Sequence, residues 1–115
     1  MKMPVLISNR SIITCFYEGE REDGWRYLCH SSQGNDHIVQ ANRSAIGKDV
    51  VGNNMLTYFQ WRPYDGGIEI WHASKMDPAG SIPDFVKKKM AKRFSNAVQI
   101  LVNYLKTGAK PVDDL

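Results

Sequence analysis

Hydrophobic and polar residues alternate along most of the chain up to Met76, and this period of two is typical of β-strands. The alternating segments are rich in β-branched and aromatic residues, and they are separated by glycine, asparagine and aspartate. The clearest turn is Tyr64-Asp65-Gly66-Gly67, because Asp-Gly favours a tight hairpin. We expect about five antiparallel strands, over residues 12–18, 25–31, 37–46, 55–61 and 68–76.

After Met76 the hydrophobic period lengthens to about 3.6 residues, which predicts a helix. One stripe at three- and four-residue steps contains Val86, Met90, Phe94, Ala97, Leu101 and Leu105. Ser81 is placed to cap the helix start and Gly108 to end it, so we expect one long helix from Pro83 to Thr107. A sheet and a helix that each have one apolar side bury these sides together, which predicts an α+β fold.

The alternation of strand side chains also predicts which residues share a face. We expect the first hairpin to pair Phe16 with Tyr27 and Thr14 with Cys29, with Ile12 opposite Ser31, so that all six point inward. In the last strand Glu69 and Lys75 favour water, which turns Ile70, His72, Ser74 and Met76 inward. His72 is either a hydrogen-bonded core residue or a contact for a polar ligand group. The two cysteines, Cys15 and Cys29, are expected to be reduced.

Composition limits the classes of protein that fit. A chain of 115 residues with 43% hydrophobic and 23% charged residues is typical of one globular domain. No segment approaches the roughly 18 consecutive apolar residues of a membrane span, and the N-terminus lacks a signal-peptide pattern, so a cytoplasmic protein is expected. The net charge of +3 permits contact with an anionic surface without requiring it.

Basic residues gather in the first three turns of the expected helix, at Lys87, Lys88, Lys89, Lys92 and Arg93. They form either a solvated helix face or a surface that docks on anionic lipid, where each basic residue contributes about 1 kcal/mol. Their position near the helix N-terminus opposes the helix dipole.

The segment Asp77-Pro78-Ala79-Gly80-Ser81-Ile82-Pro83 resembles the D-x-x-G-x-(I/L)-P junction of START domains, the steroidogenic-acute-regulatory-protein-related lipid-transfer family. Ser8-Asn9-Arg10 is similar to the S-x-R that opens a strand of that family. The order of strands, hairpins and terminal helix also looks like the second half of a START domain, from about Pro4 to Gly108. The chain is about half the family's length, so it resembles the C-terminal half only, as a single domain over residues 1–115 with a frayed tail at 109–115.

The resemblance implies a truncated helix-grip fold, in which a long helix covers a curved sheet and encloses one lipid without catalysis or cofactor. The wall residues would be Ile12, Thr14, Phe16, Tyr27, Cys29, Ile70, His72, Val86, Met90, Phe94 and Leu101. Sterol-binding members of the family carry an arginine in the cavity where this chain has Phe16. This difference weakens an assignment to sterols, and the class of lipid stays open. A second copy of the chain is expected to replace the missing half.

Three other functions are weighed against lipid binding. An enzyme is disfavoured because Cys29 and His30 are neighbours on a strand and point to opposite faces, and the histidines lack metal-ligand spacing. Binding of single-stranded nucleic acid is disfavoured because Trp25, Trp61 and Trp71 are scattered relative to the basic helix. The alternative that we keep is a self-associating protein-interaction domain without a cavity.

Overall fold

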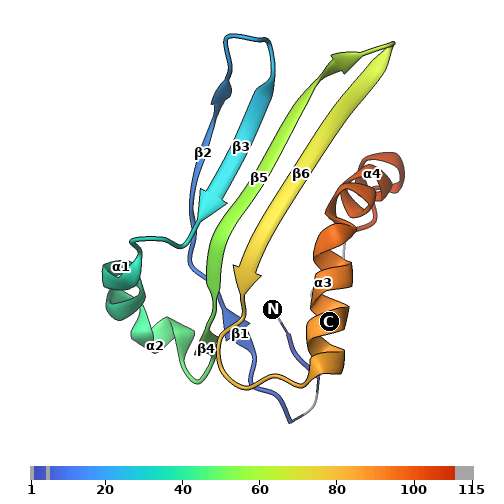
Figure 1. Cartoon of the computed structure of the whole chain (residues 1–115). Coiled ribbons are helices and arrows are strands. Elements are labelled where there is room, and N and C mark those ends of the chain that lie inside the picture. The colour runs from blue at the N-terminus through green and yellow to red at the C-terminus, as the bar shows by residue number, and fades with distance from the viewer. Residues whose placement is uncertain (1, 5, 111–115) are drawn as a thin grey trace.

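The computed structural model describes residues 2–4 and 6–110, and it has an α+β architecture. Four antiparallel strands form the main sheet in the order β2-β3-β5-β6, with β2 at Cys15–Glu20, β3 at Arg26–Ser31, β5 at Asn53–Tyr64 and β6 at Gly67–Asp77. Two short strands, β1 (Arg10–Ser11) and β4 (Val50–Val51), pair in parallel at the base of this sheet (Figure 1).

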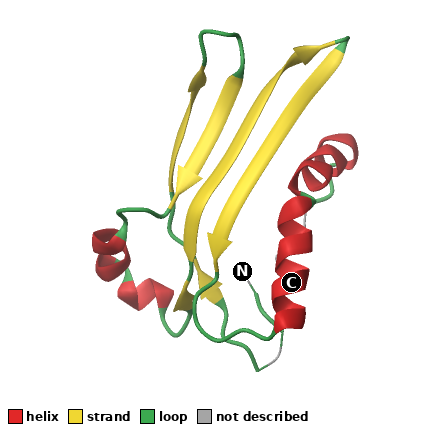
Figure 2. Cartoon of the chain, in the orientation of Figure 1, coloured by secondary structure: helices red, strands yellow, loops and turns green. Residues whose placement is uncertain are grey.

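The helices lie on either side of the sheet's base. The pair α1 (Asp36–Ala41) and α2 (Arg43–Ile46) follows β3, and the pair α3 (Asp84–Ser95) and α4 (Ala97–Thr107) runs beside β6. The tips of both hairpins extend beyond all four helices (Figure 2). The fold class predicted from the sequence is therefore confirmed at the level of an antiparallel sheet with helices.

The β5–β6 hairpin is the element that the sequence predicts best. Tyr64 pairs with Gly67, and the two residues between them, Asp65 and Gly66, both have positive φ, at 48° and 75°. This is the backbone of a tight hairpin turn, for which Asp-Gly is favoured. A register shift between Asn54 and Leu56 interrupts the ladder near its base.

The predicted register of the β2–β3 hairpin is wrong. Phe16 pairs with His30 rather than Tyr27, and Tyr17 pairs with Cys29. An odd shift of register exchanges the two faces of a strand. Phe16 therefore lies on the opposite face from Tyr27 and Cys29, which corrects the shared inner face expected for these residues.

The cause of this shift is the length of β2, which continues through Gly19 to Glu20 instead of ending at Glu18. The Tyr27 ring lies against Gly19, and a Cβ added there would come within 2.9 Å of the Tyr27 hydroxyl. An aromatic ring across the ladder can support a glycine in an edge strand. The turn then falls at residues 21–25, where the Arg21 N–H donates to the Trp25 carbonyl at 2.7 Å.

Residues 37–46, expected as a strand, are helical instead. Ile38, Val39, Ala45 and Ile46 recur at helical spacing, and Ile46 is buried. The β-branched residues of this segment favoured a strand, but their helical spacing places the apolar side chains on one side of α1 and α2. Ile12, Ile13, Ile38 and Ile46 share a shallow hollow of about 580 Å³ with Arg10 and Asp49.

The expected single long helix is divided at Asn96. The Ser95 hydroxyl donates to the Lys92 carbonyl at 2.9 Å, and the Asn96 N–H is shared between the Lys92 and Arg93 carbonyls. Ser and Asn compete locally with helical hydrogen bonds, so two adjacent residues of this kind favour a break. The predicted end at Gly108 is confirmed by its φ of 70° and by its N–H bond to Tyr104. No Ser81 side-chain cap forms, because the helix begins at Asp84.

The best-buried apolar cluster lies at the start of α3. Val86 is fully buried and Met90 and Ile82 are nearly so, with Met3, Ile7 and Phe94 packed around them. The core therefore joins the N-terminal segment to α3. Most of the tail expected to fray, residues 111–115, lies outside the described residues.

Candidate functional site

The junction between β6 and α3 is held by the buried side chain of Arg10. Its Nε donates to the Pro78 carbonyl at 2.9 Å and its Nη2 to the Ala79 carbonyl at 3.0 Å, while Nη1 donates to the Ser8 carbonyl. Ala79 and Gly80 have positive φ there, at 58° and 70°. The motif read from the sequence is thus a turn that Arg10 holds, which places α3 next to β6.

A cleft of about 480 Å³ opens between the end of β6 and α3. Its wall is mainly apolar, with Met76 and Pro78 on one side and Met90, Ala91 and Phe94 on the other. The remaining lining residues are Ser74, Ser95, Lys75 and Lys87. Ligand pockets in proteins commonly measure about 300–1,000 Å³ and have mostly apolar walls with few polar groups, which is the character of this cleft.

The sheet face that carries Ser74 and Met76 is here named the cleft face. Three rows of paired residues cross β6, β5 and β3 on this face: Ser74–Thr57–His30, His72–Phe59–Leu28 and Ile70–Trp61–Arg26. The His72 ring lies 4.5 Å from the Phe59 ring, centroid to centroid. The cleft face is therefore polar close to α3 and apolar farther along the strands.

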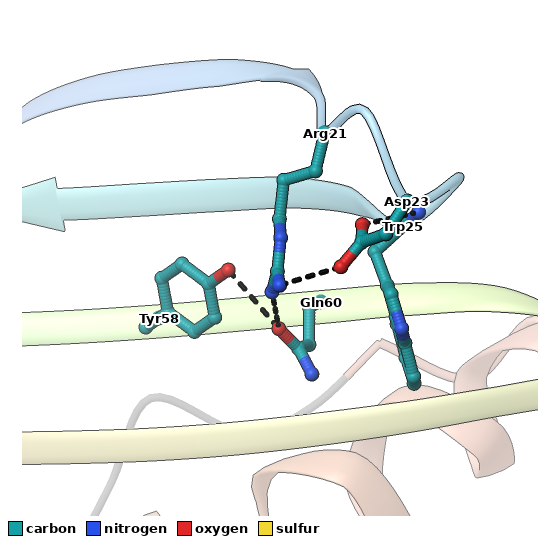
Figure 3. A network of polar contacts seen from close by, with 5 residues as sticks. All are labelled: Arg21, Asp23, Trp25, Tyr58 and Gln60. Carbon is teal, nitrogen blue, oxygen red and sulfur yellow. Dashed lines mark hydrogen bonds and ion pairs between the residues drawn. The ribbon is translucent and has the colours of Figure 1, made fainter.

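The opposite face is built from polar and aromatic contacts. Arg21 donates to Gln60 at 2.8 Å and pairs with Asp23 at 2.6 Å, and the Tyr58 hydroxyl also donates to Gln60 (Figure 3). These bonds tie the β2–β3 turn to β5. Farther along, Arg62 pairs with Glu69 at 3.0 Å.

The electrostatics differ between the two faces. On the cleft face burial lowers the pKa of His30 and His72, and the nearby His30 lowers the pKa of His72 further. On the opposite face hydrogen bonds from Trp71 and Arg62 lower the pKa of the Glu69 carboxyl. Burial thus favours the neutral form of both histidines on the cleft face.

The structure brings together only some of the predicted wall residues. Met90 and Phe94 line the cleft, and Ile70 and His72 lie on the cleft face. Val86 is buried in the core beside the cleft, and Leu101 is partly exposed on α4. Phe16 also lies on the cleft face, but it is an exposed residue of the edge strand β2. The others lie elsewhere: Ile12 and Thr14 precede β2, and Tyr27 and Cys29 lie on the opposite face.

The basic residues of α3 surround an exposed aromatic side chain that sequence reasoning missed. Phe85 is 60% exposed, and Lys88, Lys89 and Lys92 follow at spacings that make them its neighbours on the helix surface. Lys87 instead lies at the cleft, and Arg93 is half-buried. The sequence could have predicted this exposure, because Phe85 lies outside the hydrophobic stripe through Val86 and Met90.

Other kinds of site find little support in the described part of the chain. Residues 2–4 and 6–110 hold no group of three histidine, cysteine or acidic side chains that could bind a metal. Cys15 and Cys29 are both free thiols, as predicted. Within the same ranges no helix is long and apolar enough to cross a membrane.

The chain was compared with protein-family models, curated proteins and solved structures. No family model, no curated protein and no solved structure matches this chain.

Proposed function

We propose that this chain is a non-catalytic lipid-binding module of the START type, which holds the apolar part of one lipid in the cleft between β6 and α3. The observation that carries the proposal is the cleft itself, about 480 Å³ in volume and lined by Met76, Met90 and Phe94. In this proposal α3 and α4 act as the gripping helix of a truncated helix-grip fold.

The arrangement of the sheet supports this ligand class. Beyond the cleft, the cleft face continues with Leu28, Phe59, Trp61 and Ile70, which keep part of their surface exposed to solvent. An acyl chain that leaves the cleft along these residues would cover apolar surface, at about 25 cal/mol per Å². The cleft and the apolar rows together favour a ligand that is long and mostly hydrocarbon.

Native mass spectrometry of the purified protein tests the proposal directly, with a co-purified lipid mass as the expected result. Ala91 is exposed and lines the cleft, so Ala91→Trp fills the space with little loss of stability, and we expect it to abolish lipid binding. The matched control is Ala41→Trp, an exposed site on α1 away from the cleft. Equal lipid binding by both variants would exclude the cleft as the site.

We propose in addition that the surface formed by Phe85, Lys88, Lys89 and Lys92 docks on anionic membranes. Three ammonium groups attract anionic lipid, and an aromatic ring among them can enter the headgroup region. Lys88→Gln, Lys89→Gln and Lys92→Gln together should weaken binding to phosphatidylserine vesicles about 10-fold or more, and Lys106→Gln on α4 should have a much smaller effect. Unchanged vesicle binding by the triple variant would eliminate this surface.

A second candidate function is self-association as a protein-interaction domain. It is favoured by β2, which is an outer strand of the sheet and carries Phe16 and Tyr17 at 67% and 70% exposure. An exposed edge strand with aromatic residues can pair with the same strand of a second copy. The same native mass spectrum separates the two functions, because a stable dimer without bound lipid would favour this one.

A further inference from the structure

A chain of hydrogen bonds crosses the cleft face and ends at the cleft. Ser74 and Thr57 share one bond of 3.2 Å between their hydroxyl oxygens, and the Thr57 hydroxyl donates to the Asn54 side-chain oxygen at 3.2 Å. The Asn54 side-chain nitrogen lies 3.2 Å from His30 Nδ1. We name these four residues, Ser74, Thr57, Asn54 and His30, the polar relay.

The orientation of the Asn54 amide, with its oxygen towards Thr57 and its nitrogen towards His30, sets the direction of the bonds in the polar relay. An amide nitrogen only donates, so His30 Nδ1 accepts and the ring proton lies on Nε2. Thr57 has a single hydroxyl proton, which it gives to Asn54, so the proton between Thr57 and Ser74 must come from Ser74. The Ser74 oxygen is thereby left with acceptor capacity and no proton of its own to offer.

Burial makes this direction hard to reverse. Asn54 is 1% exposed and Thr57 is 7% exposed, so water does not readily replace a bond that either loses. Ser74 is exposed and lines the cleft. The polar relay therefore presents one oriented acceptor, the Ser74 Oγ, beside the apolar side chains of Met76 and Met90.

We infer that the cleft selects a lipid whose head is a neutral hydroxyl, which donates its proton to Ser74 Oγ. This inference rests on the proposed lipid binding and specifies its ligand class. A carboxylate has no proton to donate there, and an ether or ester oxygen is only an acceptor. Lys75 and Lys87 also line the cleft and would favour a carboxylate, but both are exposed and their charges stay hydrated.

Three probes with the same alkyl chain test the selection on the whole protein: dodecan-1-ol, its methyl ether and dodecanoate. Binding is measured by isothermal titration calorimetry. We expect the alcohol to bind about 5-fold more tightly than the ether, which is the usual contribution of one hydrogen bond. The alcohol should also bind more tightly than dodecanoate.

Variants of the polar relay separate this role from simple packing. Ser74→Ala should remove the preference for the alcohol over the ether, whereas Ser74→Thr keeps a hydroxyl and should retain it. Thr57→Val releases the Ser74 proton for donation, so the ether should regain affinity relative to the alcohol. Circular dichroism of each variant checks that the fold is kept.

The outcomes distinguish this inference from the proposed function. If all three probes bind but Ser74→Ala leaves their relative affinities unchanged, the inference is wrong and lipid binding stands. A preference for dodecanoate that is lost in Lys75→Gln with Lys87→Gln would also overturn it. If none of the probes binds, both proposals fail.

Discussion

Arg10 offers the sharpest test of how this fold is held together. Its side chain is 3% exposed and donates to three backbone carbonyls, two of which belong to the turn that leads into α3. Arg10→Met keeps much of the side chain's length and removes the donors. The turn at Pro78 and Ala79 then loses the bonds that tie it to β1.

The expected loss follows from the contacts. A hydrogen bond from a charged donor contributes about 1.5–3 kcal/mol, and the Pro78 and Ala79 carbonyls are on half-buried residues. Ser8 is exposed, so water can replace its bond. Two bonds give about 3–6 kcal/mol, and relief of the burial cost of the charge reduces this sum. We expect the free energy of unfolding to fall by about 3–4 kcal/mol.

Urea denaturation followed by tryptophan fluorescence measures this change. Arg26→Met, at an exposed position of β3, is the control and should shift the free energy of unfolding by about 0.5 kcal/mol or less. Arg10→Lys keeps the charge but not the forked geometry, so it should fall between the two. A free energy of unfolding for Arg10→Met within 1 kcal/mol of the unaltered protein, with the same dependence on urea, would refute this account of the turn.

Three further predictions concern stability. Gly80→Ala should cost about 2–3 kcal/mol in urea denaturation, because its φ is 70° and its new Cβ would lie 3.1 Å from Arg10 Nη2; Gly66→Ala, at φ 75° with open space, should cost only about 1–2 kcal/mol, and equal losses would exclude the steric part. Val86→Ala should lower the free energy of unfolding by about 2 kcal/mol and Phe85→Ala by about 0.5 kcal/mol or less, and the reverse order would contradict the burial of this helix. The lowered pKa values of His30 and His72 mean that the unfolded chain binds protons more readily, so stability should be full well above pH 6.5 and decline as the pH falls through 6.5 towards the folded pKa values; urea midpoints that do not change between pH 7.5 and 5 would contradict this.

The sequence predicts elements best where local chemistry decides the backbone. Asp65-Gly66 fixes the β5–β6 turn because few residues adopt positive φ, and Gly108 ends α4 for the same reason. The stripe through Val86, Met90 and Phe94 predicts the helix and its buried side. These signals need no knowledge of distant parts of the chain.

The errors arise where distant contacts decide. The register of β2 depends on whether Gly19 belongs to the strand, and that depends on the ring of Tyr27 across the ladder. The error placed Tyr27 and Cys29 on the same face as Phe16, so the predicted wall was partly wrong. The polar relay joins β3, β5 and β6, so the sequence predicted Ser74 and His72 on this face but not the bonds that link Ser74 to Thr57, Asn54 and His30.

Arg10 also bears on the order in which this chain folds. Its acceptors in the turn before α3, the Pro78 and Ala79 carbonyls, lie 68 and 69 residues farther along the sequence. Closing so long a loop is slow because its entropy cost precedes any gain. During synthesis the ribosome must release the whole sheet before Arg10 can reach them. We therefore expect the contact of Arg10 with the Pro78 and Ala79 carbonyls to be among the last to form. In a nascent chain that ends before Pro78, the Arg10 side chain would remain exposed to solvent.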